Sequence, residues 1–265
     1  MTTLQIVVLA IVQGLTEFLP ISSSGHLVLV PAFAGWADQG LMFDVAVHMG
    51  SLAAVCIYFR RDIAAMMRGG LLLARGRHDS LDARMALAIG IGTVPAAIAG
   101  LLFADWIEAN LRDPRVVVVT LSVFGILMAV ADRVGRRERN VTDVGPRHAL
   151  LIGLAQAMAL VPGTSRSGIT ITAGRLLGYT RHDAARFSFL LSAPVILLAG
   201  SYKMLTLVLE GADIAWTELA TGIAVSGLVA YLSIEFFMRF ISAIGLLPFA
   251  LYRLGLAGLI VYVLL

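Results

Sequence analysis

The residues best suited to chemistry lie in two short stretches that are versions of one another. The first runs from Ile11 to His26 and the second from Leu154 to Ile169, and they align without a gap 143 positions apart. Because the match includes polar residues inside otherwise apolar sequence, it indicates an internal duplication. The shared polar and glycine positions are Gln13 and Gln156, Ser22 and Ser165, Ser24 and Ser167, and Gly25 and Gly168.

The two stretches differ where chemistry would need them to differ. Glu17 aligns with Leu160, Ser23 with Arg166, and His26 with Ile169. One copy therefore holds groups that can move protons, and the other offers a fixed cation. A duplicated membrane fold whose halves have specialised around one shared site would have this pattern. We therefore expect Glu17, Ser23, His26 and Arg166 to lie in one cavity.

Each of these residues also has a purely structural interpretation. Glu17 could mark a half-helix end at a wet interface, and an ionisable group in an apolar segment is otherwise expensive. Arg166 could pair with Glu17 or extend to the interface, although its planar fork also suits phosphate. The Ser22–Gly25 stretch could be only a loop with a helix N-cap. Followed by a half-helix inside a membrane, the same residues instead form an anion site.

The composition is that of an integral membrane protein. Hydrophobic residues make up 59% and charged residues 14% of the chain, against about 25% charged residues in ordinary soluble domains. The mean hydropathy is +0.89. Met85 to Ala104 is 20 residues without a charge, which is long enough to span a bilayer. Cys56 is the only cysteine, so an intrachain disulfide and a multi-cysteine metal site are excluded.

Five apolar segments in each half of the chain predict an all-α polytopic membrane protein with an inverted-topology repeat. The first two segments of each half are short and broken by Ser, Gly and Pro, which predicts a re-entrant helical hairpin. Three transmembrane helices then complete each half, and this odd number inverts the second half relative to the first. We expect one integral membrane domain over 1–265, with repeat one at about 1–133, a cytoplasmic linker at about 134–146 and repeat two at about 147–265.

The distribution of charge predicts the orientation. Fifteen of the 20 Lys and Arg residues fall in the 61–84 loop with the adjoining Arg60, the 132–147 linker, the 175–186 loop and Arg239. Cytoplasmic loops are enriched in Lys and Arg, so these four places are assigned to the cytoplasm. Both termini then face the outer side, and the polar loops of the two hairpins, which enter from opposite sides, could meet near mid-membrane. The cations assigned to the outer side are Arg112, Arg115, Lys203 and Arg253.

The two motifs resemble the signatures of a known family. Gln13-x-x-x-Glu17, followed by Pro20-x-Ser22-Ser23-Ser24-Gly25-His26, is similar to the first signature of the bacterial undecaprenyl-pyrophosphate phosphatase family (BacA/UppP). Pro162-Gly163-Thr164-Ser165-Arg166-Ser167-Gly168 resembles the second signature. The family has Glu or Gln at the position of Gln13. The resemblance covers essentially the whole chain and implies hydrolysis of undecaprenyl diphosphate to the monophosphate carrier of cell-wall precursors. It also implies an inner-membrane location, a periplasmic active site, and bacitracin resistance on overproduction.

The resemblance also implies a role for each motif residue. Ser23 would be the nucleophile at phosphorus, and His26 the acid or base that serves it or the attacking water. Glu17, helped by Gln13, would hold a divalent cation, Mg²⁺ or Ca²⁺, against the diphosphate. Arg166 would stabilise the phosphoryl oxygens in the transition state. Further phosphate contacts would come from Ser22, Ser24, Gly25, Thr164, Ser165 and Ser167.

A lipid-phosphate flippase or transporter is the rival class, since inverted repeats with broken helices are common in transporters. A carrier has no need of a Ser/His/Glu set in one repeat and an Arg in the other, which favours the phosphatase. A structural scaffold would not explain Glu17 and Arg166.

Asp44 and His48, one helical turn apart, are expected to form a wet helix end. The partners expected are the polyprenyl diphosphate and membrane lipids, with no nucleic acid, and a homodimer is left open.

Overall fold

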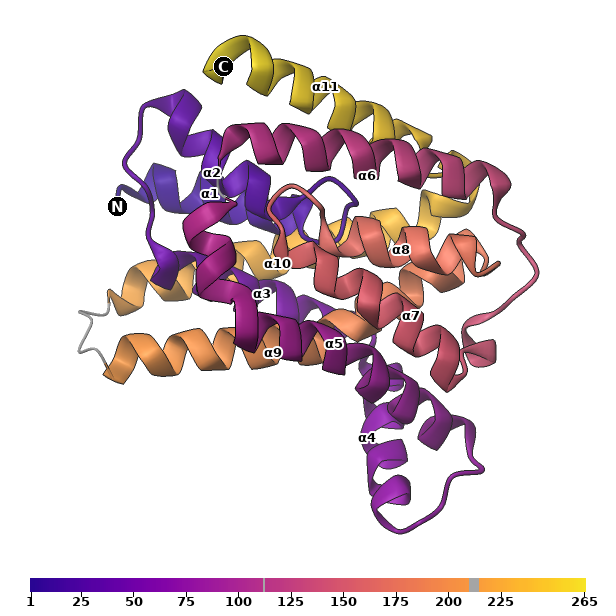
Figure 1. Cartoon of the computed structure of the whole chain (residues 1–265). Coiled ribbons are helices and arrows are strands. Elements are labelled where there is room, and N and C mark those ends of the chain that lie inside the picture. The colour runs from indigo at the N-terminus through magenta and orange to yellow at the C-terminus, as the bar shows by residue number, and fades with distance from the viewer. Residues whose placement is uncertain (112, 210–214) are drawn as a thin grey trace.

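The computed structural model describes residues 1–111, 113–209 and 215–265, and these residues form a bundle of helices (Figure 1). Within these ranges there is no sheet, and a single parallel bridge joins Arg139 to Tyr179. The α-helices are α1 (Thr3–Thr16), α2 (Ser23–Ala34), α3 (Leu41–Tyr58), α4 (Arg60–Ala74), α5 (Leu81–Asn110), α6 (Pro114–Val134), α7 (Pro146–Ala157), α8 (Arg166–Leu176), α9 (Arg181–Leu209), α10 (Trp216–Ile244) and α11 (Leu247–Leu264). Two short 3₁₀ turns are η1 (Val141–Asp143) and η2 (Met158–Leu160).

Five helices are long and apolar enough to cross a bilayer. They are α3, α5 over Leu81–Ala104, α6, α9 over Arg181–Thr206, and α10. A span needs about 20 predominantly apolar residues. The expectation of an all-α, multi-pass membrane protein is therefore confirmed. Among the described residues, three of the five lie before the linker and two after it, and α11, with 18 residues, is as long as α3.

Each sequence motif lies in a pair of short helices joined by a turn, α1 with α2 and α7 with α8. In both pairs a serine precedes the second helix with a positive φ, 76° at Ser22 and 69° at Ser165. These are the only non-glycine residues with positive φ in the described parts of the chain. Such a conformation costs of order 1–3 kcal/mol and is typical of functional sites. The two aligned serines therefore share an unusual backbone conformation as well as a residue type.

The two pairs occupy opposite positions in the bundle. The α1 helix begins at the end of the molecule that carries both termini, whereas α7 begins at the opposite end (Figure 1). The α1 helix packs against α10, and α7 packs against α5. Both contacts are close: a Cβ on Gly14 would lie 2.7 Å from the Ser226 carbonyl oxygen, and one on Gly153 would lie 2.5 Å from that of Gly92. Glycines at these positions let the helix backbones approach, as is common between helices in membranes.

The end of the molecule opposite the termini is held together by charge. The Asp132 carboxylate on α6 accepts hydrogen bonds from Arg175 at 3.2 Å, from two nitrogens of Arg181 at 2.7 and 2.8 Å, and from the Leu246 amide at 3.1 Å. Arg175 has no exposed surface. The ends of α6 and α8 and the starts of α9 and α11 are therefore fixed relative to one another by a saturated buried ion cluster.

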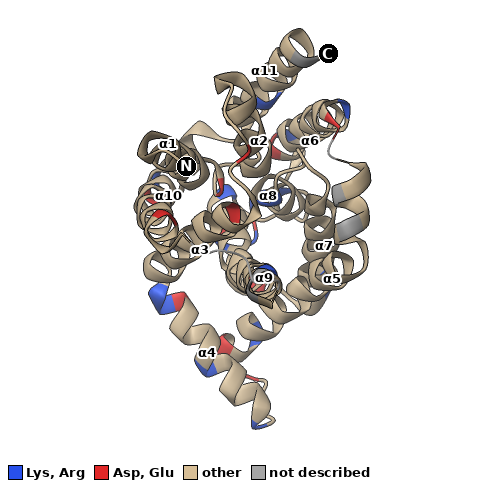
Figure 2. Cartoon of the chain, turned by 90° about the vertical axis from the view of Figure 1, so that its left-hand side faces the viewer, with Lys and Arg blue, Asp and Glu red and all other residues tan. Residues whose placement is uncertain are grey.

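The 61–84 segment is not a simple loop, which corrects that part of the prediction. Most of it is α4 and the start of α5, and α4 extends away from the bundle (Figures 1 and 2). Cationic residues are visible on α4, and others lie at several places in the bundle (Figure 2). The apolar faces of Met67 and Leu71 are largely exposed beside these cations. The high charge of this segment hid an amphipathic helix.

Candidate active site

Glu17 lies where α1 ends and is the centre of the site. Only 7% of it is exposed. Its main-chain N–H closes the last turn of α1 by donating to the Gln13 carbonyl oxygen. One turn earlier, the amide of Gln13 donates to Glu17 Oε2 at 3.1 Å. The Gln13–Glu17 pair on one helical face, expected from the spacing, is therefore present.

Arg166, at the first position of α8, reaches Glu17 from the other hairpin. Its Nη2 donates to Glu17 Oε1 at 2.9 Å, and its Nη1 donates to the Ser188 carbonyl oxygen on α9 at 3.2 Å. The guanidinium also lies 5.8 Å from the ring centroid of Phe18, which is fully buried against Phe189. The two residues, 149 positions apart, are thus in contact, and pairing with Glu17 is the arrangement that the structure adopts.

Ser23 takes the position in α2 that Arg166 takes in α8. Each is the first residue of its helix. Ser23 Oγ donates to Glu17 Oε2 at 2.7 Å, so the carboxylate joins the serine of one hairpin to the arginine of the other. The expectation that Glu17, Ser23 and Arg166 lie together is confirmed. The N-termini of α2 and α8 both carry positive partial charge. An anion placed beside Ser23 and Arg166 is therefore stabilised by both helices.

His26 makes its hydrogen bonds away from this group. Nδ1 lies 2.8 Å from the Ser22 carbonyl oxygen, and Nε2 lies 2.6 Å from the Tyr252 hydroxyl on α11. Because a carbonyl only accepts, Nδ1 carries the hydrogen and Tyr252 donates to Nε2 in the neutral ring. The two rings are stacked, 12° apart in plane. Among the described residues, no hydrogen bond links His26 directly to Ser23 or Glu17.

His48, which the spacing assigned to a wet helix end, instead faces the site. Its Nε2 lies 3.5 Å from Glu17 Oε2, and its Nδ1 lies 2.7 Å from the Asp44 carbonyl oxygen. The side chain is 31% exposed. Sequence reasoning missed this residue because the contact between α1 and α3 is tertiary. An ionisable group in the middle of a spanning helix was the available signal.

The remaining predicted phosphate-binding residues are of two kinds. Some have side chains that hydrogen-bond to the main chain of the two turns, and the others do not. Ser167 Oγ donates to the Leu19 carbonyl oxygen at 3.1 Å and so ties the second motif to the first. Ser165 Oγ accepts from the Gly168 amide at 3.2 Å and caps α8. Ser22 is buried with its Oγ 3.5 Å from that of the exposed Ser24. Gly25 and Thr164 are also buried, and Thr164 Oγ1 has no hydrogen-bond partner among the described residues.

Arg253, which the charge distribution assigned to the outer side of the membrane, lies inside the bundle and is the second arginine of the site region. It has no exposed area. Its guanidinium donates to four main-chain carbonyl oxygens, those of Gly163 at 2.9 Å, Thr164 at 3.0 Å, Leu121 at 3.2 Å and Thr120 at 3.3 Å. These bonds hold the turn that precedes Arg166. Main-chain acceptors leave no mark in a sequence, so the role could not be predicted.

The residues present fit a partly protein-bound divalent cation. Gln13 Oε1 is buried without a hydrogen-bond partner among the described residues, and it belongs to the same amide as the nitrogen that contacts Glu17. An unpaired buried acceptor is costly. Within those same residues, no three His, Cys, Asp or Glu side chains converge. The protein would therefore supply only part of the coordination shell, as is usual for Mg²⁺ bound together with phosphate.

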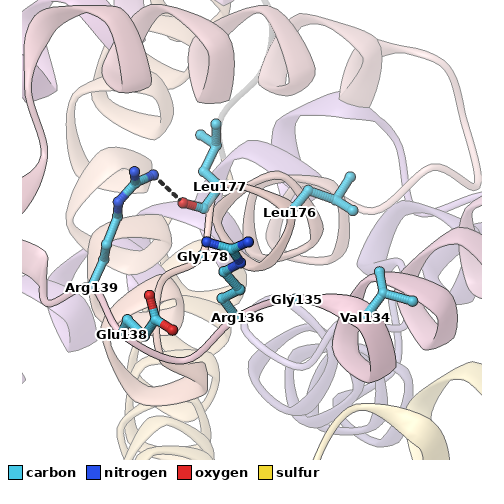
Figure 3. A pocket seen from close by; sticks show the side chains of 8 residues that line it. All are labelled: Val134, Gly135, Arg136, Glu138, Arg139, Leu176, Leu177 and Gly178. Carbon is cyan, nitrogen blue, oxygen red and sulfur yellow. Dashed lines mark hydrogen bonds between the residues drawn. The ribbon is translucent and has the colours of Figure 1, made fainter.

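A separate surface cavity lies at the other end of α8 (Figure 3). Arg139 donates to the Leu177 carbonyl oxygen there, and Arg136 points over the same turn (Figure 3). The cavity shares no lining residue with the Glu17 site. Arg166 and Leu176 bound α8, so about 15 Å of helix separates the two places. The lining residues are Val134, Gly135, Arg136, Glu138, Arg139, Leu176, Leu177 and Gly178.

Comparison with known proteins identifies relatives along the whole chain. The profile of the family described as bacitracin resistance protein BacA matches residues 6–259. Proteins named undecaprenyl-diphosphatase from Teredinibacter turnerae and Nitrosococcus oceani are each 51% identical over 263 residues, covering 99% of both chains. A third of that name, from Alcanivorax borkumensis, is 52% identical over 250 residues and covers 94% of both chains.

Proposed function

Because the chain belongs to the bacitracin resistance protein BacA family, we propose that it hydrolyses undecaprenyl diphosphate to undecaprenyl phosphate and inorganic phosphate. The relatives named above carry the corresponding enzyme name. The observation that carries the proposal is that Ser23 and Arg166 both donate hydrogen bonds to the Glu17 carboxylate. The monophosphate produced is the carrier form needed for cell-wall precursors, so the reaction recycles that carrier.

Ser23 is proposed as the nucleophile. Its hydroxyl donates to Glu17 Oε2, which turns the oxygen lone pairs away from the carboxylate and toward the space before the helix N-termini. As Oγ bonds to the terminal phosphorus, its proton passes to Glu17 and the bond to the bridging oxygen breaks. The lipid monophosphate leaves. Water then releases phosphate from the serine and restores the hydroxyl.

Arg166 is proposed to hold the phosphoryl group during this transfer. Phosphoryl transfer depends mainly on positioning and on neutralising the oxygens around phosphorus. The guanidinium is held at the N-terminus of α8 by the Ser188 carbonyl oxygen and by Glu17. A diphosphate competes with Glu17 for this cation. The Glu17–Arg166 pair thus keeps both charges in place in the membrane interior, where unpaired charges are expensive.

Two roles implied by the family stay predictions. Glu17 and the Gln13 amide oxygen would hold the divalent cation, which would supply further neutralisation of the diphosphate oxygens. His26 would act as an acid or base, and its Nε2 becomes available when the Tyr252 hydroxyl moves from its 2.6 Å contact. The lipid tail of the bound substrate would extend from the site sideways, between helices, into the bilayer.

The fold is proposed to be an inverted repeat in the inner membrane. The opposite directions of α1 and α7 and the matched serine conformations support the repeat. The cationic α4 and the 132–147 segment lie at one end, which favours that end as cytoplasmic. His48 is eighth among the 18 residues of α3, which supports a site near mid-membrane, and we propose that the site opens to the periplasmic side.

The orientation predicts a difference between two surface positions. In a Cys56→Ala background, a cysteine at Asn110 is expected to react with a membrane-impermeant thiol reagent in intact cells, and one at Ser80 only after permeabilisation. Asn110 ends α5 and Ser80 precedes it, so one helix separates the two tests. Labelling of Ser80→Cys alone in intact cells would reverse the assignment.

The activity itself is tested with the purified chain in detergent. We expect release of inorganic phosphate from undecaprenyl diphosphate, with none from Ser23→Ala. Detergent removes the two compartments that a transporter needs, so a flippase would release no phosphate under these conditions. Absence of release by a monodisperse wild-type protein, in the presence of Mg²⁺ or Ca²⁺, would favour the transporter.

A further inference from the structure

The ring of His48 is fixed in one orientation. Its Nδ1 lies 2.7 Å from the Asp44 carbonyl oxygen, which can only accept a hydrogen bond, so Nδ1 carries the hydrogen. In the neutral ring the other nitrogen then presents a lone pair. That nitrogen, Nε2, points at Glu17 Oε2 from 3.5 Å. Two acceptors therefore face one another at the centre of the site.

A third acceptor belongs to the side chain that contacts Glu17. Gln13 Oε1 is buried without a partner among the described residues, while Gln13 Nε2 contacts Glu17 Oε2. Facing acceptors repel unless a proton or a cation lies between them, and a buried acceptor without a partner costs free energy. A cation beside Glu17 Oε2 would separate this oxygen from His48 Nε2, and Gln13 Oε1 would join the same ion once the amide turns its oxygen toward Glu17.

We propose that His48 is a nitrogen ligand of the divalent cation in this chain, alongside Glu17 and the amide oxygen of Gln13. Two ligand atoms each about 2.1 Å from one ion, at tetrahedral or octahedral angles, lie roughly 3.0–3.5 Å apart. The observed 3.5 Å agrees with this separation. Metal-binding histidines also usually donate the other ring N–H to a carbonyl or carboxylate, as His48 does to Asp44.

The donor set determines which ions the site prefers. Oxygen ligands alone suit Mg²⁺, Ca²⁺ and Mn²⁺, whereas an imidazole adds affinity for first-row transition metals, and least for Mn²⁺ among them. Since the side chain of His48 is partly exposed, the ion would also be open to water and to the diphosphate oxygens. The proposal rests on the cation of the proposed function. It deepens that function by naming an imidazole ligand, which Mn²⁺ can bind and which Ca²⁺, held by oxygen ligands, does not use.

The test measures binding rather than turnover. Purified wild-type protein is titrated with Mn²⁺ alone, and the bound ion is examined by pulsed electron paramagnetic resonance. We expect a nitrogen coupling from a directly bound imidazole, which changes when the protein is labelled with ¹⁵N-histidine. In His48→Gln the coupling is lost and Mn²⁺ affinity falls at least about tenfold, while Ca²⁺ affinity changes little. His182→Gln, which alters an exposed histidine, should behave as wild type.

The outcomes separate this proposal from the phosphatase activity. Bound Mn²⁺ without a nitrogen coupling in the wild type overturns the proposal, as does a coupling that persists in His48→Gln or the absence of any Mn²⁺ binding. The wild-type spectrum decides the matter even if His48→Gln fails to fold. Phosphate release from undecaprenyl diphosphate, measured on the same preparation, reports separately on the proposed function.

Discussion

Arg166→Ala is expected to lower kcat for undecaprenyl diphosphate by on the order of 10²–10³, the effect of removing a contact that acts on the transition state. Arg166→Lys should lose most of this activity too, because lysine keeps the charge but lacks the planar fork that can contact Ser188 and a phosphoryl group together. Phosphate release by purified, monodisperse variants is the measurement. Arg136→Ala, which removes an exposed arginine from the distant cavity, is the matched control and should retain activity.

Arg166→Ala also leaves the Glu17 carboxylate buried without its cation, which destabilises the fold by about 3–5 kcal/mol. A loss of activity must therefore be separated from unfolding. The double variant Glu17→Gln/Arg166→Met removes both charges and should recover thermal stability without recovering turnover. If Arg166→Ala keeps near-wild-type kcat, this arginine only neutralises Glu17, and the proposed mechanism loses its phosphate-binding cation.

Ser23→Ala is expected to be at least as damaging, with kcat reduced by about 10³ or more, because it removes the attacking oxygen itself. The change deletes one hydrogen bond to Glu17 and leaves the Arg166 pair intact, so stability should fall by only about 1 kcal/mol. Turnover and thermal unfolding of the same preparation check both statements. Ser242→Ala, at an exposed position outside the site, is the matched control and should retain the activity.

Substantial turnover in Ser23→Ala would show that water attacks phosphorus directly. Arg166 would then keep its role, and Glu17 would orient the water instead of the serine. Trapping of a phosphorylated Ser23 in the wild-type protein would support the covalent route. The two substitutions therefore test different parts of the mechanism, the cation and the nucleophile.

The parts of the site that the sequence predicted are those encoded by side chains in repeated motifs. Aligning Ser23 with Arg166 placed both at the start of matching helices, and an ionisable Glu17 in an apolar segment required a partner. The parts that could not be predicted depend on tertiary contacts. His48 becomes part of the site only because α3 packs against α1, and Arg253 finds acceptors only in the folded backbone.

The helices that the sequence predicted correctly differ in composition from the one that it missed. Hydropathy predicted the spanning helices because the bilayer imposes one length and one composition on each of them. It missed α4, since an interfacial amphipathic helix has high charge and low mean hydropathy. The last apolar segment forms α11, which is as long as α3 and directs Arg253 to the turn before Arg166.

Neighbouring residues of α11 contact both hairpins, Tyr252 through His26 and Arg253 through the turn at Gly163. Ribosomes add these two residues after every other group in the site, so the earlier hairpins emerge while their supports do not yet exist. A nascent chain therefore carries Ser23, Glu17 and Arg166 without the bonds that position the second turn. We therefore expect the site to become complete only when α11 has been added, and a chain that ends before α11 to lack activity.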